Sequence, residues 1–158
     1  MKYIQPFILT LIISVATINT HAQVNTDTSK ESLAHFSPTI SSEFMKLIAT
    51  ANLAEGKEYF MRKCSSCHDE YKSKTHGKGP NLWNILDRKA GSAIGFSYST
   101  AMRESGHTWN LATLNYYLTK TKRAVPGRSM NFRGIKKEQD RAKLLLFLSS
   151  MNDGKHPN

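Results

Sequence analysis

Apolar residues recur every three or four positions in three stretches of the 158-residue chain, which predicts three helices. The first covers about residues 52–67, the second begins near Asn110, whose side chain can cap it, and the third covers about residues 137–151. In the third, we expect Arg141 and Lys143 to face water. Its apolar stripe consists of Leu144, Leu145, Leu148 and Met151. No stretch alternates as a strand would, so the pattern predicts an all-α fold.

Gly56 interrupts the apolar face of the first predicted helix. That face also carries Leu53, Phe60 and Cys64 at spacings of three or four residues. A glycine inside a helix costs stability relative to alanine, so its presence favours a place where another backbone comes close. We therefore expect the last helix to cross the first at Gly56.

The N-terminus has the pattern of an export signal. Lys2 precedes an apolar segment over about residues 7–16, and residues 20–22 offer small side chains before a cleavage point. The segment is well short of the roughly 20 residues that a membrane-spanning helix needs. We predict that residues 1–22 are a signal peptide, with an uncleaved anchor as the alternative.

Two further segments follow the predicted signal. Residues 23–50 are rich in Ser, Thr and Ala, with few bulky apolar residues before residues 44–48, and we predict a tether or loosely packed extension. Residues 51–158 are predicted to form one small domain with a thin core.

The basic character of the chain belongs to the predicted domain. Residues 51–158 carry 19 Lys and Arg against 9 Asp and Glu, a net charge of +10, whereas residues 23–50 have a net charge of −1. A positive field favours nucleic acid or an acidic protein surface as partner. Since no helix-turn-helix, zinc-finger or aromatic-rich strand pattern accompanies the charge, we expect no nucleic-acid binding.

Both cysteines of the chain lie in Cys64-Ser65-Ser66-Cys67-His68. Two thiols three positions apart, followed directly by a histidine, are the attachment pattern of a c-type haem, with the histidine as the proximal iron ligand. A redox dithiol would need a βαβ setting, and a zinc site would need two more ligands at similar spacing. We predict one covalently attached haem c, which would supply much of the core. Because this haem is attached outside the cytoplasm, the motif and the signal together predict a periplasmic protein.

The sixth iron ligand has several candidates: Met61, Met102, Met130, Met151, His35, His76, His107 and His156. Met61 lies one turn before Cys64 and therefore on the wrong side of the ring. Met151 continues the apolar stripe of the last helix, where a methionine usually fills the core. Met130 follows Pro126 and Gly127 in an irregular segment that can point a side chain at the iron, but spacing alone leaves the choice open.

From about residue 51 to 150 the chain resembles class I cytochrome c, of the mitochondrial type and its bacterial counterparts. The ordered matches include Gly56, Phe60, the haem motif at 64–68, 79–82 (Gly-Pro-Asn-Leu), 88–89 (Arg-Lys), 95–98 (Gly-Phe-Ser-Tyr), 108–109 (Thr-Trp), 117–118 (Tyr-Leu), 126–127 (Pro-Gly), Met130, Phe132, 134–137 (Gly-Ile-Lys-Lys) and Leu144. The resemblance implies the cytochrome c fold, with about three to five helices around one haem.

The resemblance also implies roles for single residues. His68 and Met130 would be the axial ligands, and the Pro80 carbonyl would accept a hydrogen bond from the His68 ring. The haem propionates would be bound by Arg88, Tyr98 and Trp109. Tyr117 would donate toward the Met130 sulfur, Phe132 would seal the haem from water, and His76 would make a structural hydrogen bond.

Some residues depart from the family pattern. Met102 stands where an asparagine is usual, which makes it the rival sixth ligand. Arg128 stands where a threonine is usual, and Thr121 and Ser129 replace a common proline and lysine. These four changes put the propionate network in doubt and should alter the redox potential. Two further changes, Asn84 and Asp87 in place of glycines, are tolerable because both residue types visit left-handed backbone.

Histidine–methionine ligation suits a one-electron carrier without substrate chemistry, and we predict no enzyme activity. By resemblance, the donor is a quinol:cytochrome c oxidoreductase and the acceptor a terminal cytochrome oxidase, each with an acidic docking surface for a monomeric carrier. The candidates for a basic ring around the haem edge are Lys63, Lys72, Lys78, Lys122, Arg123, Lys136 and Lys137. The rival functions are a peroxidase-like or nitrite-reducing haem enzyme, and haem-based sensing or assembly through residues 23–50.

Overall fold

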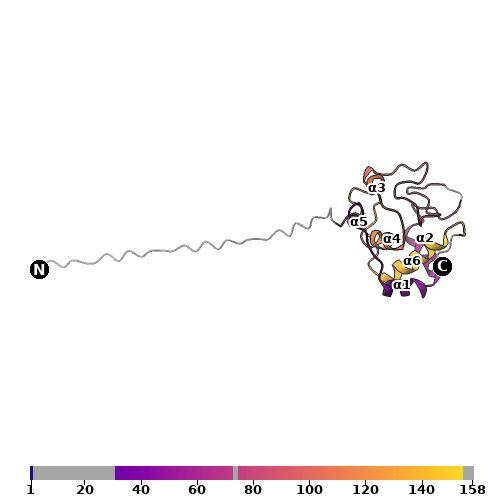
Figure 1. Cartoon of the computed structure of the whole chain (residues 1–158), viewed down its shortest axis with the longest axis horizontal. Helices are drawn as coiled ribbons and strands as arrows, with labels where there is room; N and C mark the ends of the chain where they lie inside the picture. The colour runs from indigo at the N-terminus through magenta and orange to yellow at the C-terminus, as the bar shows by residue number, and fades with distance from the viewer. Residues whose placement is uncertain (2–30, 73–74, 155–158) are drawn as a thin grey trace.

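Six helices and the segments between them make up the part of the chain that the structure describes. The computed structural model describes Met1, residues 31–72 and residues 75–154. The helices are α1 (Ser42–Ala49), α2 (Leu53–Lys63), α3 (Thr100–Glu104), α4 (Leu111–Thr119), α5 (Thr121–Ala124) and α6 (Glu138–Ser150). Helices α1, α2 and α6 gather on one side, and α3 lies with the loops on the other (Figure 1). Across the described residues the β pairing is limited to one isolated bridge, Lys89 to Thr108, so the all-α prediction is confirmed.

Helices α2 and α6 form the most extensive helix–helix contact. A Cβ added at Gly56 would collide with the Lys143 carbonyl and lie 3.1 Å from Phe147 Cβ, so the predicted close crossing is confirmed. Next to it the rings of Phe60 and Phe147 pack with centroids 5.3 Å apart. All four residues of the predicted stripe are buried, three of them on α6 and Met151 directly after it. This crossing fixes the end of α2, from which the haem motif begins.

Residues 31–50 pack on the domain, which differs from the loose extension that the sequence predicted. The Ser41 hydroxyl caps α1 by accepting the Phe44 N–H at 3.1 Å, and Phe44 and Ile48 are buried where α1 lies against α6. Further upstream, the Leu33 N–H donates to the Ala124 carbonyl of α5 at 2.8 Å. Two turns of helix give too short a pattern to predict a partner, and here α6 supplies the apolar face that α1 needs.

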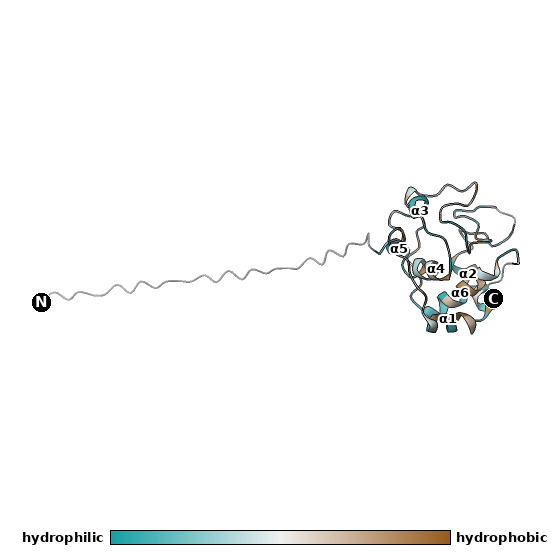
Figure 2. Ribbon diagram, in the orientation of Figure 1, coloured by the Kyte–Doolittle hydropathy of each residue, from teal (hydrophilic) through white to brown (hydrophobic). Residues whose placement is uncertain are grey.

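Arg141 is buried, so the prediction that it faces water was wrong. Its guanidinium donates to the Ile135 carbonyl at 2.8 Å, to the Lys136 carbonyl at 2.9 Å and to Asn115 Oδ1 at 2.8 Å. Helix α1 covers this side of α6, and the Phe44 ring lies against the Arg141 guanidinium. Figure 2 shows both helices with mixed brown and teal segments rather than one clean polar face. The buried cation is tolerated because its donors are paired.

Two other predicted helices are present, and the end of one is shifted. Helix α2 ends at Lys63, and the chain continues as a turn to Cys67. Helix α4 begins after Asn110, which forms a capping box with Thr113, as the sequence predicted for this cap. The predicted signal peptide falls at residues 1–22, outside the described residues apart from Met1. No helix within the described residues has the length and apolar character to span a bilayer.

Candidate functional site

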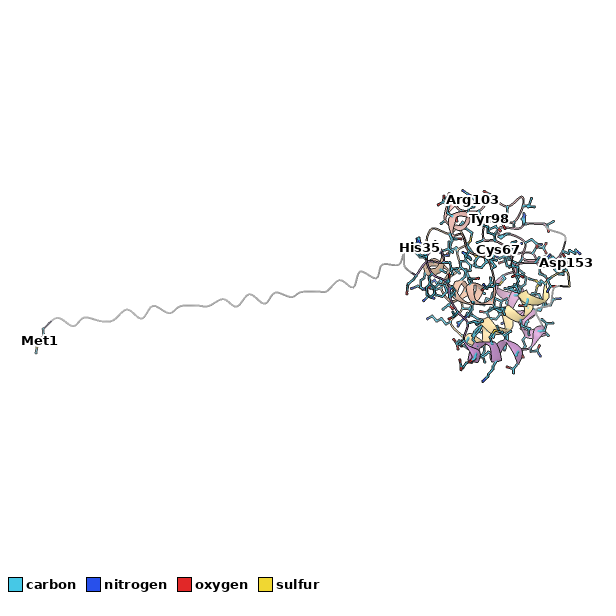
Figure 3. The ribbon with its side chains drawn as sticks, viewed as in Figure 1. Met1, His35, Cys67, Tyr98, Arg103 and Asp153 are labelled. Carbon is cyan, nitrogen blue, oxygen red and sulfur yellow. The ribbon has the colours of Figure 1, made fainter. Side chains whose placement is uncertain are left out.

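A cavity of about 430 Å³ lies between the α2–α6 side and the loops. All ten residues that the sequence assigned to the haem line it: Cys64, Cys67, His68, Pro80, Arg88, Tyr98, Trp109, Tyr117, Met130 and Phe132. Its volume falls in the range of about 300–1,000 Å³ that cofactor pockets occupy. In the view of Figure 3, the half-buried Cys67 lies between His35 and Asp153. Segments far apart in sequence therefore meet at one place.

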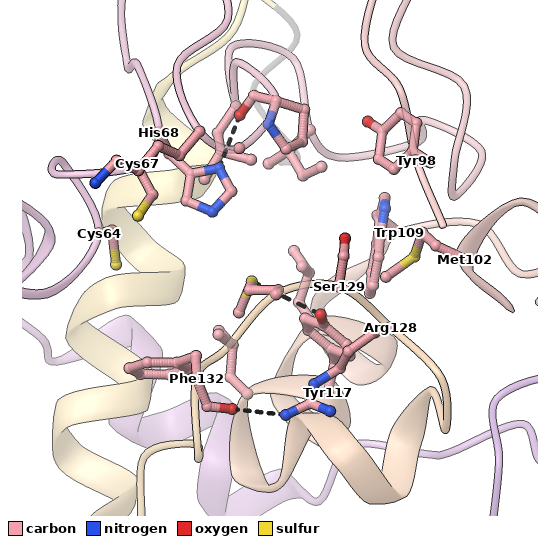
Figure 4. A pocket seen from close by; sticks show the side chains of 18 of the residues that line it. Cys64, Cys67, His68, Tyr98, Met102, Trp109, Tyr117, Arg128, Ser129 and Phe132 are labelled. Carbon is pink, nitrogen blue, oxygen red and sulfur yellow. Dashed lines mark hydrogen bonds between the residues drawn. The ribbon is translucent and has the colours of Figure 1, made fainter. Parts of the chain in front are cut away.

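The two thiols lie on a turn that directly follows α2. The Cys64 N–H donates to the Phe60 carbonyl at 2.8 Å, and the N–H groups of Cys67 and His68 both return to the Cys64 carbonyl, at 3.0 and 2.9 Å. This turn keeps both sulfurs and the imidazole on the cavity (Figure 4). Burial, with a smaller contribution from Cys67, raises the pKa of the Cys64 thiol to about 12.

The His68 ring is oriented by the loop that crosses behind it. Its Nδ1–H donates to the Pro80 carbonyl at 2.8 Å, as the dashed line in Figure 4 marks. Only a glycine fits at position 79, since an added Cβ would lie 2.7 Å from His68 Nδ1 and closer still to Cε1. Burial lowers the pKa of His68, although the Pro80 hydrogen bond acts in the opposite direction. The ring is therefore held neutral, with Nε2 left as a lone-pair donor.

The wall across the cavity from His68 carries Tyr117 and Phe132 (Figure 4). The Tyr117 hydroxyl donates toward Met130 Sδ at 3.7 Å, in the geometry that the resemblance implied. Burial raises the pKa of Tyr117 to about 12, against a smaller opposing effect of Arg128, so the hydroxyl keeps its proton as a donor. Met130 and Phe132 are both half-buried on this wall.

The other candidate sixth ligands separate by position. Met102 is buried on α3 and lines the same cavity, beside Trp109 in Figure 4. Met61 is 47 % exposed on α2, whereas Met151 is a core residue, as predicted. His156 lies outside the described residues, and among the candidates that the structure describes the other one on the cavity is Met130, which receives a hydroxyl donor.

The residues assigned to the propionates gather at the loop end of the cavity. Arg88 donates to the Asn81 carbonyl at 2.9 Å, and burial lowers its pKa. Burial raises the pKa of Tyr98, with Arg88 acting in the opposite direction. The Trp109 ring meets the Tyr117 ring edge to face, with centroids 5.1 Å apart. Their roles toward a haem remain predictions. A cation and aromatic donors at this end of the cavity suit the carboxylates of the propionates.

His76 makes structural hydrogen bonds, as predicted. Its Nδ1 accepts the Asn81 N–H at 3.0 Å and its Nε2 donates to the Ile94 carbonyl at 2.8 Å. The sequence reasoning assigned no role to Asn81, which is buried and ties the Tyr71 carbonyl to the Trp83 N–H, at 2.7 Å each. Its place directly after Gly79-Pro80 was the available signal.

Two substitutions for family glycines also behave as the sequence predicted. Asn84 has φ 55° and Asp87 has φ 62°, both in the left-handed region. These residue types tolerate that region better than most, so the loop that carries Arg88 keeps its course.

The cavity fits a covalently attached haem. It combines two thiols on one edge, a neutral imidazole and a thioether on facing walls, and otherwise mostly apolar side chains. Among the described residues, no three or more His, Cys, Asp or Glu side chains gather in a group that could hold a metal ion.

Comparison with known proteins agrees with this fit. The family model for cytochrome c matches residues 53–152. Cytochrome c of Chlamydomonas reinhardtii is 42 % identical over 97 residues, which are 61 % of this chain and 87 % of that protein. Cytochrome c2 of Rhodomicrobium vannielii is 41 % identical over 104 residues, 66 % of this chain and 82 % of that protein. This chain therefore belongs to the cytochrome c family, as a class I c-type cytochrome with one covalently attached haem c.

Proposed function

We propose that this electron carrier transfers single electrons between respiratory membrane complexes through a haem that His68 and Met130 ligate. The observation that carries the proposal is that each side chain reaches the same cavity and is oriented by its own hydrogen-bond partner, Pro80 for the histidine and Tyr117 for the methionine. When bound, the haem supplies a one-electron iron couple.

The protein's part is to hold the ligands and to exclude water. His68 keeps its proton on Nδ1, where the Pro80 carbonyl accepts it, so Nε2 is free to bind a metal. Cys64 and Cys67 would form the thioethers, because both sulfurs lie on the cavity beside this ring. Phe132 and the apolar wall would keep solvent out, which favours the reduced iron.

A carrier is favoured over the rival haem enzyme. Among the described residues that line the cavity, His68 is the sole histidine, so the site offers no second imidazole for acid–base chemistry on the far wall. Arg88, Tyr98 and Trp109 would bind the propionates at the loop end. If His68 and Met130 both hold the iron, the haem would exchange electrons and leave no position open for a substrate.

The exposed lysines around the cavity would guide docking on an acidic partner surface. Lys63 and Lys78 line the cavity rim, and Lys122, Lys136 and Lys137 are exposed without an acidic partner among the described residues. Two residues of the predicted basic ring are otherwise engaged: Lys72 pairs with Asp153 at 2.6 Å, and the guanidinium of Arg123 lies 4.3 Å from the Tyr116 ring centroid. Rim charges of this kind raise the association rate more than the affinity. We infer a quinol:cytochrome c oxidoreductase as donor and a cytochrome oxidase as acceptor, with a monomeric carrier in the periplasm.

Ligation is tested by the absorption spectrum of the oxidised holoprotein. The weak near-infrared band from methionine to iron should be present in the native protein, lost in Met130→Ala and kept in Met102→Ala. Loss of the band in Met102→Ala alone would transfer the ligand role to Met102. A native protein without the band would favour a differently ligated haem and the rival haem enzyme.

Docking is tested by the rate of electron exchange with a purified cytochrome oxidase as ionic strength rises. Lys122→Gln should slow exchange at low salt, and the difference should fade as salt screens the charge. Lys46→Gln on α1 is the matched control, because Lys46 is exposed and lies outside the predicted basic ring, and it should behave as the native protein. Equal rates for native protein, Lys122→Gln and Lys46→Gln would argue against the basic ring.

Export is tested by fractionating bacteria that express the whole chain. The haem-stained protein should leave the cells with the periplasmic fraction and begin at Gln23. Retention with the membranes and an intact N-terminus would instead support the uncleaved anchor.

A further inference from the structure

An arginine lies in the wall of the cavity that carries Met130. Arg128 lines the cavity beside Tyr117 (Figure 4), and its guanidinium has no acidic partner among the described residues. Burying half of a cation without a counter-charge costs free energy, so the N–H groups of the guanidinium need hydrogen-bond acceptors that offset this cost.

Three hydrogen bonds join Arg128, Thr121 and Phe132. Arg128 Nε donates to Thr121 Oγ1 at 2.7 Å, and Arg128 Nη2 donates to the Phe132 carbonyl at 3.2 Å. The Thr121 hydroxyl also donates to the Phe132 carbonyl, and Thr121 is fully buried at the start of α5. One side chain thus ties both ends of the segment 128–132 to a helix, with Met130 at its centre.

Besides these bonds, the segment is held by the Tyr117–Met130 hydrogen bond and by the packing of Met130 and Phe132 on the core. Its own backbone contributes a Phe132 N–H to Met130 carbonyl bond at 3.1 Å and an Arg128 N–H to Val125 carbonyl bond at 3.2 Å. Gly127 and Gly134, with φ 84° and 116°, bound it on both sides with residues that allow wide backbone freedom. Side-chain hydrogen bonds therefore restrain the segment at both ends, through Arg128 and Thr121, and at Met130, through Tyr117.

We propose that Arg128 is a positioning residue that, with Thr121, holds segment 128–132 closed so that Met130 stays at the cavity. This inference rests on the proposed function, in which Met130 ligates the iron. The same guanidinium places a fixed positive charge next to the Tyr117–Met130 pair, which disfavours the more positive oxidised iron. Arg128 thus has two separable effects, closure through its planar fork of donors and a raised reduction potential through its charge.

The two effects are separated by substitutions at one position. Arg128→Lys keeps the charge but cannot donate to two acceptors with a planar fork, whereas Arg128→Leu loses both. Thr121→Val removes the shared hydroxyl at nearly constant volume and leaves the charge in place. Arg133→Leu is the matched control, because Arg133 belongs to the same loop and is exposed.

The measurements use the oxidised full-length holoprotein. The rate at which added imidazole displaces the methionine, followed as loss of the near-infrared band, reports how often the segment opens. We expect this rate to rise roughly tenfold or more in Arg128→Leu, Arg128→Lys and Thr121→Val, as loss of a charge-assisted hydrogen bond implies. Arg133→Leu should match the native rate. The reduction potential should fall in Arg128→Leu and stay near the native value in Arg128→Lys.

The outcomes separate this inference from the ligation on which it rests. A native protein that lacks the Met130-dependent band overturns the ligand assignment and the positioning role together. A native band with equal imidazole rates in Arg128→Leu, Thr121→Val and Arg133→Leu overturns the positioning role alone. A rate in Arg128→Lys equal to the native rate also overturns it, because the fork geometry would then be irrelevant.

Discussion

The two sides of the molecule are held together by different interactions. On the helix side, α1, α2 and α6 pack apolar side chains such as Phe44, Phe60 and Leu145 against one another. On the loop side, polar side chains satisfy backbone groups that no regular element pairs, as Arg88 does for the Asn81 carbonyl and Arg128 for the Phe132 carbonyl. The first side supplies stability, and the second shapes a cavity that a cofactor must complete.

This difference implies that substitutions on the helix side should change the free energy of unfolding and leave iron ligation intact. Substitutions on the loop side should change ligation or pH response at a smaller cost in stability. Four predictions test the distinction.

Phe44→Ala should have the largest effect. Phe44 is 4 % exposed in the contact of α1 with α6, and truncating a buried phenylalanine costs about 3–5 kcal/mol. Urea denaturation of the holoprotein measures the loss, and the near-infrared band of the folded protein should stay unchanged. Met45→Ala, at an exposed neighbouring position, is the control. A loss below about 1 kcal/mol would mean that α1 contributes little to the core.

Gly56→Ala should destabilise the protein by about 1–3 kcal/mol, because the new Cβ would collide with the Lys143 carbonyl and force α2 and α6 apart. The same urea experiment measures it, with Lys57→Ala at an exposed neighbouring position as control. A more stable variant would show that helix propensity outweighs the crossing and that the two helices can adjust.

His107→Ile should change the pH dependence of stability. Burial lowers the pKa of His107 to about 4, although the Ser105 backbone raises it. As pH falls below about 6.5, the unfolded chain binds a proton that the folded protein excludes, so the native protein loses stability until about pH 4. The variant should lose less stability than the native protein between about pH 7 and pH 5 in urea titrations. An equal loss of stability in the variant and the native protein would mean that another group causes the pH dependence. His35→Gln, at an exposed site, serves as control.

Asp153→Asn should have the smallest effect. The Asp153 carboxylate accepts from Lys72 and from Asn84 Nδ2, at 2.6 and 2.8 Å, and these contacts lower its pKa to about 2. Its stabilisation is present above the unfolded pKa of about 4 and is lost as pH falls toward 2. Thermal midpoints should therefore differ slightly between variant and native protein at neutral pH and converge near pH 2. A difference that persists at low pH would contradict the ion-pair explanation.

The sequence by itself determined the helices with long periodic patterns, the close crossing at Gly56 and the haem motif, because these depend on local spacing and on residue chemistry. Tertiary structure decided which elements pack together and which side chains those contacts bury, because local spacing does not specify either. Helix α1 has too few turns for its sequence to show which face is buried. The sequence pattern places Arg141 on the water-facing side of α6, but α1 covers that side. Thr121 and Arg128 were single departures from a family pattern until the fold brought them to the Phe132 carbonyl. Contacts between segments far apart in sequence depend on how whole elements pack, which no local pattern records.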